Sequence, residues 1–192
     1  MKTTARALSG GIEAHTRKFL EGLNSSDGPA IYELPVEDAR AVLENAQHVE
    51  VDKLPADVED TTFPCGPGGK VSVRLVRPKG ASGANRAKAT LPAIIYCHGG
   101  GWVLGSKDTH DRLIREIANG ANACVVFVNF TQAPEARYPV AIEEVYAATK
   151  YVAENGKSLV WPARTIGLCR CEGWCGFIGH VPPDRRAAAH EG

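Results

Sequence analysis

The spacing of apolar side chains changes along the chain, and each change predicts a different kind of element. Up to residue 57, apolar residues recur at three- and four-residue steps, which is typical of amphipathic helices. A break at 24–29 that contains Ser, Gly and Pro predicts the end of a first helix, and a second is expected to begin near Pro35. Glu37 and Asp38 then lie in its first turn, where the helix dipole favours acidic side chains. Its predicted inner face consists of Val36, Ala39, Val42 and Leu43.

A period of two from 58 to 78 predicts a β-hairpin that turns at the glycines of 66–69. Strand and helix patterns then alternate. Apolar strands are expected at 91–97 and 123–129, and helices at 108–118 and 140–154. The inner faces predicted for these helices are Leu113, Ile114, Ile117 and Ala118 in the first, and Ile142, Val145, Tyr146, Thr149 and Val152 in the second. Buried strands separated by helices predict an α/β fold, with a mostly parallel sheet covered on both faces.

The composition is that of a globular protein. Of the 192 residues 44% are hydrophobic and 23% charged, and 22 basic residues balance 22 acidic ones. This balance argues against a disordered chain and against a nucleic-acid partner. The apolar runs are short, and residues 1–11 lack the apolar stretch of a secretory signal, so we expect a cytoplasmic protein without membrane insertion. Three of the six cysteines are scattered and three crowd into 169–175, which fits a reduced compartment better than a disulfide framework. The oligomeric state stays unknown.

The tract His98-Gly99-Gly100-Gly101-Trp102 directly follows an apolar strand and carries the strongest chemical signal. Three glycines allow a sharp turn and bring backbone N–H groups close to a ligand, because no Cβ stands in the way. Such N–H groups can stabilise the oxyanion of an acyl-transfer intermediate. Glycine-rich loops between strand and helix also bind phosphates or serve simply as turns, and the tract alone leaves these alternatives open.

Asp108, His110 and Asp111 form a second polar cluster. A metal site there is disfavoured because no further ligand follows at suitable spacing. We expect instead that Asp108 or Thr109 caps the following helix, with Asp111 in its first turn.

Taken with other motifs, the glycine tract resembles that of the hormone-sensitive-lipase family within the α/β-hydrolase fold. The supporting motifs are Asp108-Thr109-His110-Asp111, Ala133-Pro134-Glu135 and Tyr138-Pro139-Val140-Ala141, and the resemblance covers about residues 10–167. It implies the N-terminal part of an α/β-hydrolase fold with a helical cap segment at the N-terminus, incomplete at the C-terminus. It also implies a carboxylic ester hydrolase that acts on short acyl esters through an acyl-enzyme, with a small-molecule ester as substrate and no cofactor.

The resemblance also implies roles for individual residues. The amides of Gly99 and Gly100 are expected to form the oxyanion hole, while His98 and Gly101 support the loop. Trp102 is expected to line the substrate pocket, although simple packing is an equal alternative. Where the family has Asp-Tyr-Arg-Leu-Ala-Pro-Glu, this chain has Asn129-Phe130-Thr131-Gln132-Ala133-Pro134-Glu135, which changes the ion pairing expected in that loop.

The expected nucleophile is missing from the sequence. An α/β-hydrolase esterase needs a serine in G-x-S-x-G, followed by an acid and a histidine. Residues 162–167 resemble the lead into the strand before that turn, but Leu168-Cys169-Arg170-Cys171-Glu172-Gly173 follows, and no serine occurs after Ser158. Asp184, His180 and His190 match no motif for the acid or base. We therefore expect this chain to be inactive as written.

Two explanations compete for the segment 168–192, which loses all periodicity. In the first, the reading frame or gene model is wrong just before the serine turn, so that the chain is truncated before its nucleophile. In the second, Cys169, Cys171, Cys175 and His180 form a zinc site, although their spacing is not a common one. The predicted domains are a helical cap segment at 1–57, a partial hydrolase core at 58–167 and an aberrant or disordered tail at 168–192. A non-catalytic remnant or binding module is the functional alternative.

Overall fold

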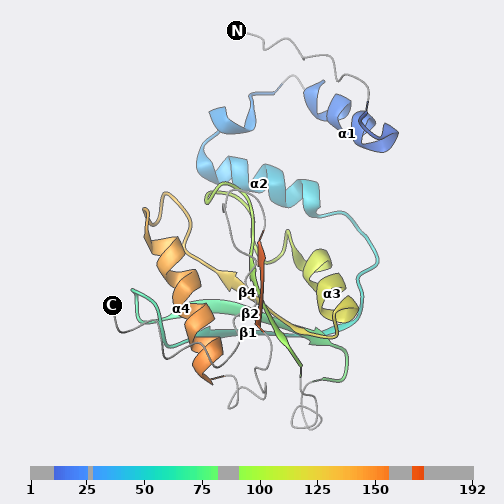
Figure 1. Cartoon of the computed structure of the whole chain (residues 1–192). Coiled ribbons are helices and arrows are strands. Elements are labelled where there is room, and N and C mark those ends of the chain that lie inside the picture. The colour runs from blue at the N-terminus through green and yellow to red at the C-terminus, as the bar shows by residue number, and fades with distance from the viewer. Residues whose placement is uncertain (1–10, 26–27, 82–90, 156–165, 171–192) are drawn as a thin grey trace. The chain divides into compact units, whose positions relative to one another are not determined.

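The computed structural model describes residues 11–25, 28–81, 91–155 and 166–170 (Figure 1). Two compact units divide at Pro35. The first, residues 1–35, contains α1 (Ala14–Asn24) and the 3-10 turn η1 (Ile31–Glu33). The Glu13 carboxylate caps α1, because it accepts a hydrogen bond from the Thr16 amide at 3.0 Å. In the described part of the chain, no helix is both long enough and apolar enough to cross a bilayer.

The second unit, residues 36–192, is built on a five-stranded sheet with the order β1-β2-β4-β3-β5. β2 pairs with β1 and β4 in antiparallel fashion, whereas β3 pairs with β4 and β5 in parallel. The sheet is therefore mixed rather than mostly parallel, because the hairpin strand β2 lies between β1 and β4. The strands are β1 (Ala56–Phe63), β2 (Val71–Pro78), β3 (Ala93–Cys97), β4 (Cys124–Asn129) and β5 (Ile166–Arg170), and the helices are α2 (Val36–Gln47), α3 (Asp111–Gly120) and α4 (Val140–Asn155).

The predicted hairpin is confirmed, and its turn explains one glycine. β1 and β2 pair from Ala56 opposite Pro78 to Phe63 opposite Val71. Gly66 in the connection has φ +83°, and a Cβ there would lie 2.8 Å from a methyl carbon of Val71. Only glycine fits both the backbone conformation and the space.

Helices cover both faces of the sheet, as the buried strands predicted. α3 and α4 lie on opposite sides of it (Figure 1). Successive residues of β4 alternate between two apolar clusters: Val126 and Val128 belong to the cluster that includes α4, and Val125 and Phe127 to the cluster that includes α3. Because both faces are covered, β4 carries an unbroken apolar run. This arrangement confirms the predicted α/β class.

Several predicted helix faces were wrong in detail. Ile114 and Ala118 of α3 are fully buried, but Leu113 is 45% exposed. In α4, Val145 and Val152 are buried, whereas Tyr146 is 67% exposed. Val42 of α2 and Ile142 of α4 are also exposed. One side of α3 and one side of α4 touch the sheet, so in these two helices a residue adjacent in sequence to a buried one is turned about 100° away from it.

Two predicted boundaries also differ. α3 begins at Asp111, its N-cap position is His110, and that side chain makes no capping bond. The Thr109 hydroxyl instead donates to the Ser106 carbonyl at 2.9 Å. Asp108 and Thr109, which were expected to cap the helix, therefore belong to the turn at 106–109 that precedes it. At the other end of the unit, β5 extends the expected strand to Arg170, inside the segment 168–192 predicted as a tail. The rest of that segment, with the suggested zinc ligands Cys171, Cys175 and His180, lies outside the described residues.

Candidate active site

The glycine tract leaves the end of β3 as a tight loop. Gly100 and Gly101 have φ +119° and +63°. The Gly100 carbonyl accepts hydrogen bonds from the amides of Val103 at 3.2 Å and Leu104 at 2.9 Å. A Cβ on Gly100 would lie 2.1 Å from the Leu104 carbonyl oxygen, which is far inside van der Waals contact. The loop therefore requires glycine at position 100 for its backbone angle and for its packing.

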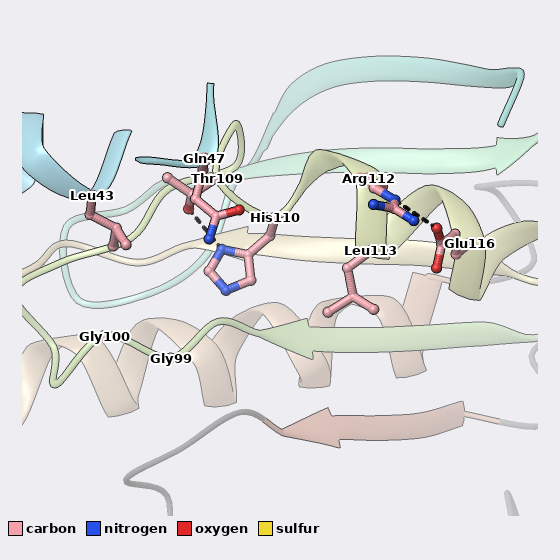
Figure 2. Close-up of a pocket in the computed structure, with 9 residues that line it drawn as sticks. All are labelled: Leu43, Gln47, Gly99, Gly100, Thr109, His110, Arg112, Leu113 and Glu116. Atoms are coloured by element: carbon pink, nitrogen blue, oxygen red, sulfur yellow. Dashed lines mark hydrogen bonds and ion pairs between the residues drawn. The ribbon is translucent and has the colours of Figure 1, made fainter. Parts of the chain in front are cut away.

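Within the described part of the chain, the amides of Gly99 and Gly100 donate to no acceptor. Both residues line a cavity of about 640 Å³ (Figure 2). The other walls come from α2 and from the start of α3 with the residues before it: Leu43, Gln47, Thr109, His110, Arg112, Leu113 and Glu116. The cavity thus combines two leucine side chains with polar groups and with backbone that has unused donors, as small-molecule sites commonly do.

The buried His98 side chain supports the glycine loop through a contact with the Gly99 carbonyl. The residue is 3% exposed, and its ring stacks on Phe127 and Phe130, with ring centroids 5.2 and 4.4 Å away. Burial lowers the pKa of the His98 imidazole to about 4, so the ring is neutral near pH 7. Nδ1 lies 2.8 Å from the Gly99 carbonyl oxygen, which requires this nitrogen to carry the proton and donate. The geometry suits the predicted supporting role, and it fixes the peptide that carries the Gly100 amide.

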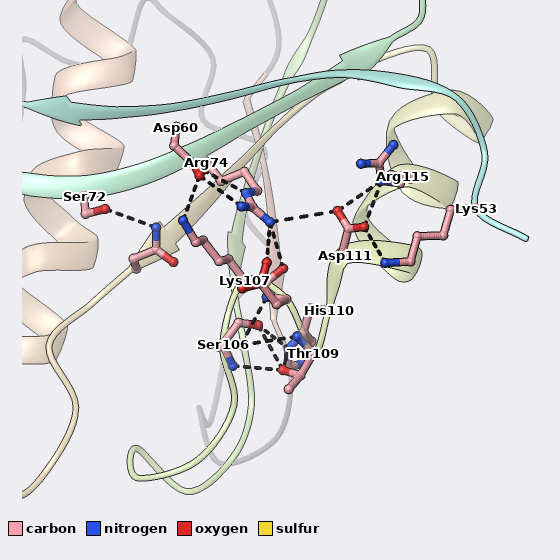
Figure 3. A network of polar contacts seen from close by, with 12 residues as sticks. Lys53, Asp60, Ser72, Arg74, Ser106, Lys107, Thr109, His110, Asp111 and Arg115 are labelled. Carbon is pink, nitrogen blue, oxygen red and sulfur yellow. Dashed lines mark hydrogen bonds and ion pairs between the residues drawn. The ribbon is translucent and has the colours of Figure 1, made fainter. Parts of the chain in front are cut away.

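The segment after the glycine loop is tied to the hairpin strands by charged groups (Figure 3). The Arg74 guanidinium on β2 donates to Asp60 on β1 at 2.8 and 2.9 Å and to Asp108 at 2.9 Å. The hydrogen bond from Arg74 holds the pKa of Asp60 well below its usual range. Lys107 adds a further donor to Asp60 at 2.7 Å. The cluster around Asp108 therefore serves to anchor the loop.

Asp111 and His110 each have protein partners of their own. Asp111 accepts from Lys53 at 2.9 Å and from Arg115 at 3.0 Å. Burial alone would raise the pKa of Asp111, but these two cations outweigh it and lower the pKa. Burial has the opposite effect on the His110 imidazole and lowers its pKa, because the charged form of histidine is the protonated one. His110 Nδ1 lies 3.1 Å from the Ser106 carbonyl oxygen. Among the described residues no group of three or more His, Cys, Asp or Glu side chains could hold a metal ion.

The loop that follows β4 holds the same glycine segment from another side. Gln132 Nε2 donates to the carbonyls of Leu104 at 2.8 Å and Gly105 at 3.0 Å, and the Ala133 amide donates to the Trp102 carbonyl at 2.9 Å. The buried Glu144 of α4 accepts from the Thr131 amide and hydroxyl at 2.6 and 2.9 Å. At 129–132, where this chain departs from the family motif, Gln132 thus contacts the glycine segment, whereas Thr131 contacts α4 and Asn129 donates to Ser72 of β2.

Arg40 and Trp102 complete the surroundings of the loop. Arg40 of α2 pairs with Glu135 at 2.6 Å and donates to the Val103 carbonyl at 2.8 Å. Trp102 has φ +63°, is 36% exposed and does not line the cavity, so its place in a substrate pocket stays a prediction. Sequence reasoning missed Arg40, Gln132 and Glu144, because these contacts join residues 13 to 95 positions apart and follow no local pattern.

β5 ends at the same edge of the sheet as β3, where the glycine loop starts. It runs parallel to β3, with Arg170 opposite Cys97. In an α/β hydrolase the serine of G-x-S-x-G stands at such a strand end. The sequence continues here as Cys171-Glu172-Gly173, which lies outside the described residues, and G-x-S-x-G occurs nowhere in the 192 residues.

Comparison with known proteins agrees with this architecture. A family model described as "alpha/beta hydrolase fold" matches residues 94–169, from β3 to β5. A protein of Acanthamoeba polyphaga mimivirus whose name describes an α/β hydrolase is 35% identical over 154 residues, which are 80% of this chain and 41% of that protein. Esterase LipI of Mycobacterium tuberculosis is 44% identical over 94 residues, 49% of this chain and 28% of that esterase.

Solved structures extend the likeness to three dimensions. The crystal structure of a thermostable esterase from Pseudomonas putida ECU1011 superposes with a TM-score of 0.75 at 40% sequence identity, and the match covers 83% of this chain and 48% of that one. The matched segments therefore span less than half the length of each of these three proteins. The strand order and these matches together place the chain in the α/β-hydrolase fold; its motifs resemble those of the hormone-sensitive-lipase family, and the similar proteins include several named as esterases.

Proposed function

We propose that this chain contributes the oxyanion-binding half of a serine carboxylic ester hydrolase acting on short acyl esters. The observation that carries the proposal is the glycine loop, where the amides of Gly99 and Gly100 have no acceptor among the described residues and border a cavity of about 640 Å³. The esterases among the similar proteins support the same reaction class.

The loop would act when the ester carbonyl becomes tetrahedral. Attack by a serine hydroxyl places a negative charge on the carbonyl oxygen, and two fixed N–H donors stabilise that charge more strongly than the neutral carbonyl. Collapse of the tetrahedral intermediate breaks the bond to the alcohol, which leaves, and keeps the acyl group on the serine; water then releases the carboxylic acid and restores the serine hydroxyl. Removal of a single such donor typically costs about 10² to 10³ in kcat.

No motif for the remaining catalytic groups occurs in the 192 residues. We propose that the chain by itself does not hydrolyse esters, because the sequence contains no G-x-S-x-G to supply the nucleophile. Purified chain should release no p-nitrophenol from p-nitrophenyl acetate or butyrate above the rate of a Gly99→Ala, Gly100→Ala double variant. A clear excess over that variant would contradict the proposed inactivity.

A chimera tests the oxyanion role directly. Residues 36–170 would replace the matched portion of the Pseudomonas putida esterase, and p-nitrophenyl butyrate hydrolysis would be measured. We expect activity, and we expect Gly100→Ala in the chimera to lower kcat by about 100-fold or more. Gly68→Ala is the matched control, because a Cβ at Gly68 meets nothing within 4 Å. A chimera that is folded by circular dichroism but inactive, or one that is indifferent to Gly100→Ala, would refute the proposal.

The coding DNA gives an independent test of the change in character after Gly167. We propose a shift of reading frame there. Translation of the DNA downstream of Thr165 in all three frames should reveal a G-x-S-x-G in another frame. If no frame contains one, the shift is ruled out.

A further inference from the structure

Arg40 on α2 holds two loops together with a single guanidinium. Its Nε donates to the Val103 carbonyl at 2.8 Å, and its Nη2 donates to the Ala133 carbonyl at 3.0 Å. Both terminal nitrogens also bind the Glu135 carboxylate, at 2.6 and 2.9 Å. The side chain is only 25% exposed. A planar fork bound to three acceptors on two loops leaves those loops little freedom to move relative to each other.

One of these contacts lies a single peptide away from the glycine turn. The Val103 carbonyl and the Leu104 amide belong to the same peptide group. Arg40 binds the carbonyl side of that group, and the amide side donates to the Gly100 carbonyl at 2.9 Å. Loss of Arg40 would therefore free the peptide that closes the turn around Gly100.

The same helix also forms a wall of the cavity. Leu43 and Gln47 line it, and they follow Arg40 by three and seven residues, which places all three on one face of α2. The face of α2 that borders the cavity is thus bonded to the glycine loop through Arg40.

We propose that Arg40 is a positioning residue, which sets the orientation of the oxyanion donors through the peptide between Val103 and Leu104. This inference rests on the proposed function of the loop, but it concerns a physical coupling that can be measured without catalysis.

Amide hydrogen exchange and ¹⁵N–¹H spectra of the 192-residue chain test the coupling. In Arg40→Gln, we expect the protection of the Leu104 and Ala133 amides to fall about tenfold or more, since charge-assisted hydrogen bonds are removed. The Gly99 and Gly100 amide resonances should shift, while the protection of Ile95 and Val126 in the core strands stays unchanged. Uniform loss of protection would show that Arg40 merely supports the fold, and unchanged protection would show that it does not hold the loop. Either result overturns the proposal.

Three further variants separate the carbonyl contacts from the ion pair. Arg40→Lys keeps the charge, but one nitrogen cannot reach three acceptors, so Leu104 protection should stay low. Glu135→Gln removes the ion pair and keeps the contact with Val103, so its effect on Leu104 should be smaller than that of Arg40→Gln. Arg137→Gln is the control, because Arg137 is exposed in the same segment. Wild-type protection in Arg40→Lys, or equal effects of Glu135→Gln and Arg40→Gln, would reject the proposed role. The chimera assay can fail without changing any of these results.

Discussion

Protonation of His98 should destabilise the glycine loop and with it the fold. Burial lowers the pKa of the His98 imidazole to about 4, against about 6.5 for the same group in the unfolded chain. Between these two values the unfolded chain binds a proton that the folded chain does not. The contribution of the neutral His98 to stability is therefore present above pH 6.5 and is lost as the pH falls toward 4. Linkage between proton binding and folding lowers the free energy of unfolding by about 2 kcal/mol at pH 5 and by about 3 kcal/mol below pH 4.

His98→Asn removes this titration and keeps a donor that can reach the Gly99 carbonyl. Urea unfolding at pH 7 and pH 5 would measure the free energy of unfolding of both proteins. We expect the wild-type protein to lose about 2 kcal/mol more than the variant between these pH values. The carboxylates whose pKa is lowered by cations, such as Asp60 and Asp111, are present in both proteins, so their contribution cancels in the comparison. His48→Asn, at an exposed position, should keep the wild-type dependence. If His98→Asn showed the same loss as the wild-type protein, the desolvation argument would be refuted.

Two further pairs of variants test packing by thermal or urea unfolding. Ile114→Ala should lower the free energy of unfolding by about 2 to 5 kcal/mol, because the side chain is fully buried. Leu113→Ala should lower it clearly less, because Leu113 is 45% exposed. Similar losses would contradict the orientation of α3. Gly105 and Gly80 have similar backbone angles, with φ of +89° and +85°, so alanine is equally strained at both positions. Gly105→Ala should nevertheless destabilise the protein more, because its Cβ would lie 2.8 Å from the Gly99 carbonyl oxygen, whereas a Cβ at Gly80 meets nothing within 4 Å. Equal losses would show that the loop has room to adjust.

The α/β class was predictable because it depends on local regularities. The apolar runs at 91–97 and 123–129 are too continuous for strands with one wet face, and helical periods between them require a sheet covered on both sides. The glycine tract was recognisable for a similar reason, since its chemistry comes from consecutive residues. The pairing of β2 with β4 was not predictable, because hydrogen bonding between strands distant in sequence leaves no mark on the spacing of either one.

The sequence alone determined which segments become helix or strand, where the glycine turn lies, and that no G-x-S-x-G is present in the 192 residues. Those properties follow from neighbouring residues and their backbone preferences. Only the tertiary structure decided that His98 stacks on Phe127 and Phe130, and that Arg40 reaches Val103 and Glu135. These contacts depend on how the helices are rotated against the sheet and how distant loops meet, and both are set by the packing of the whole unit.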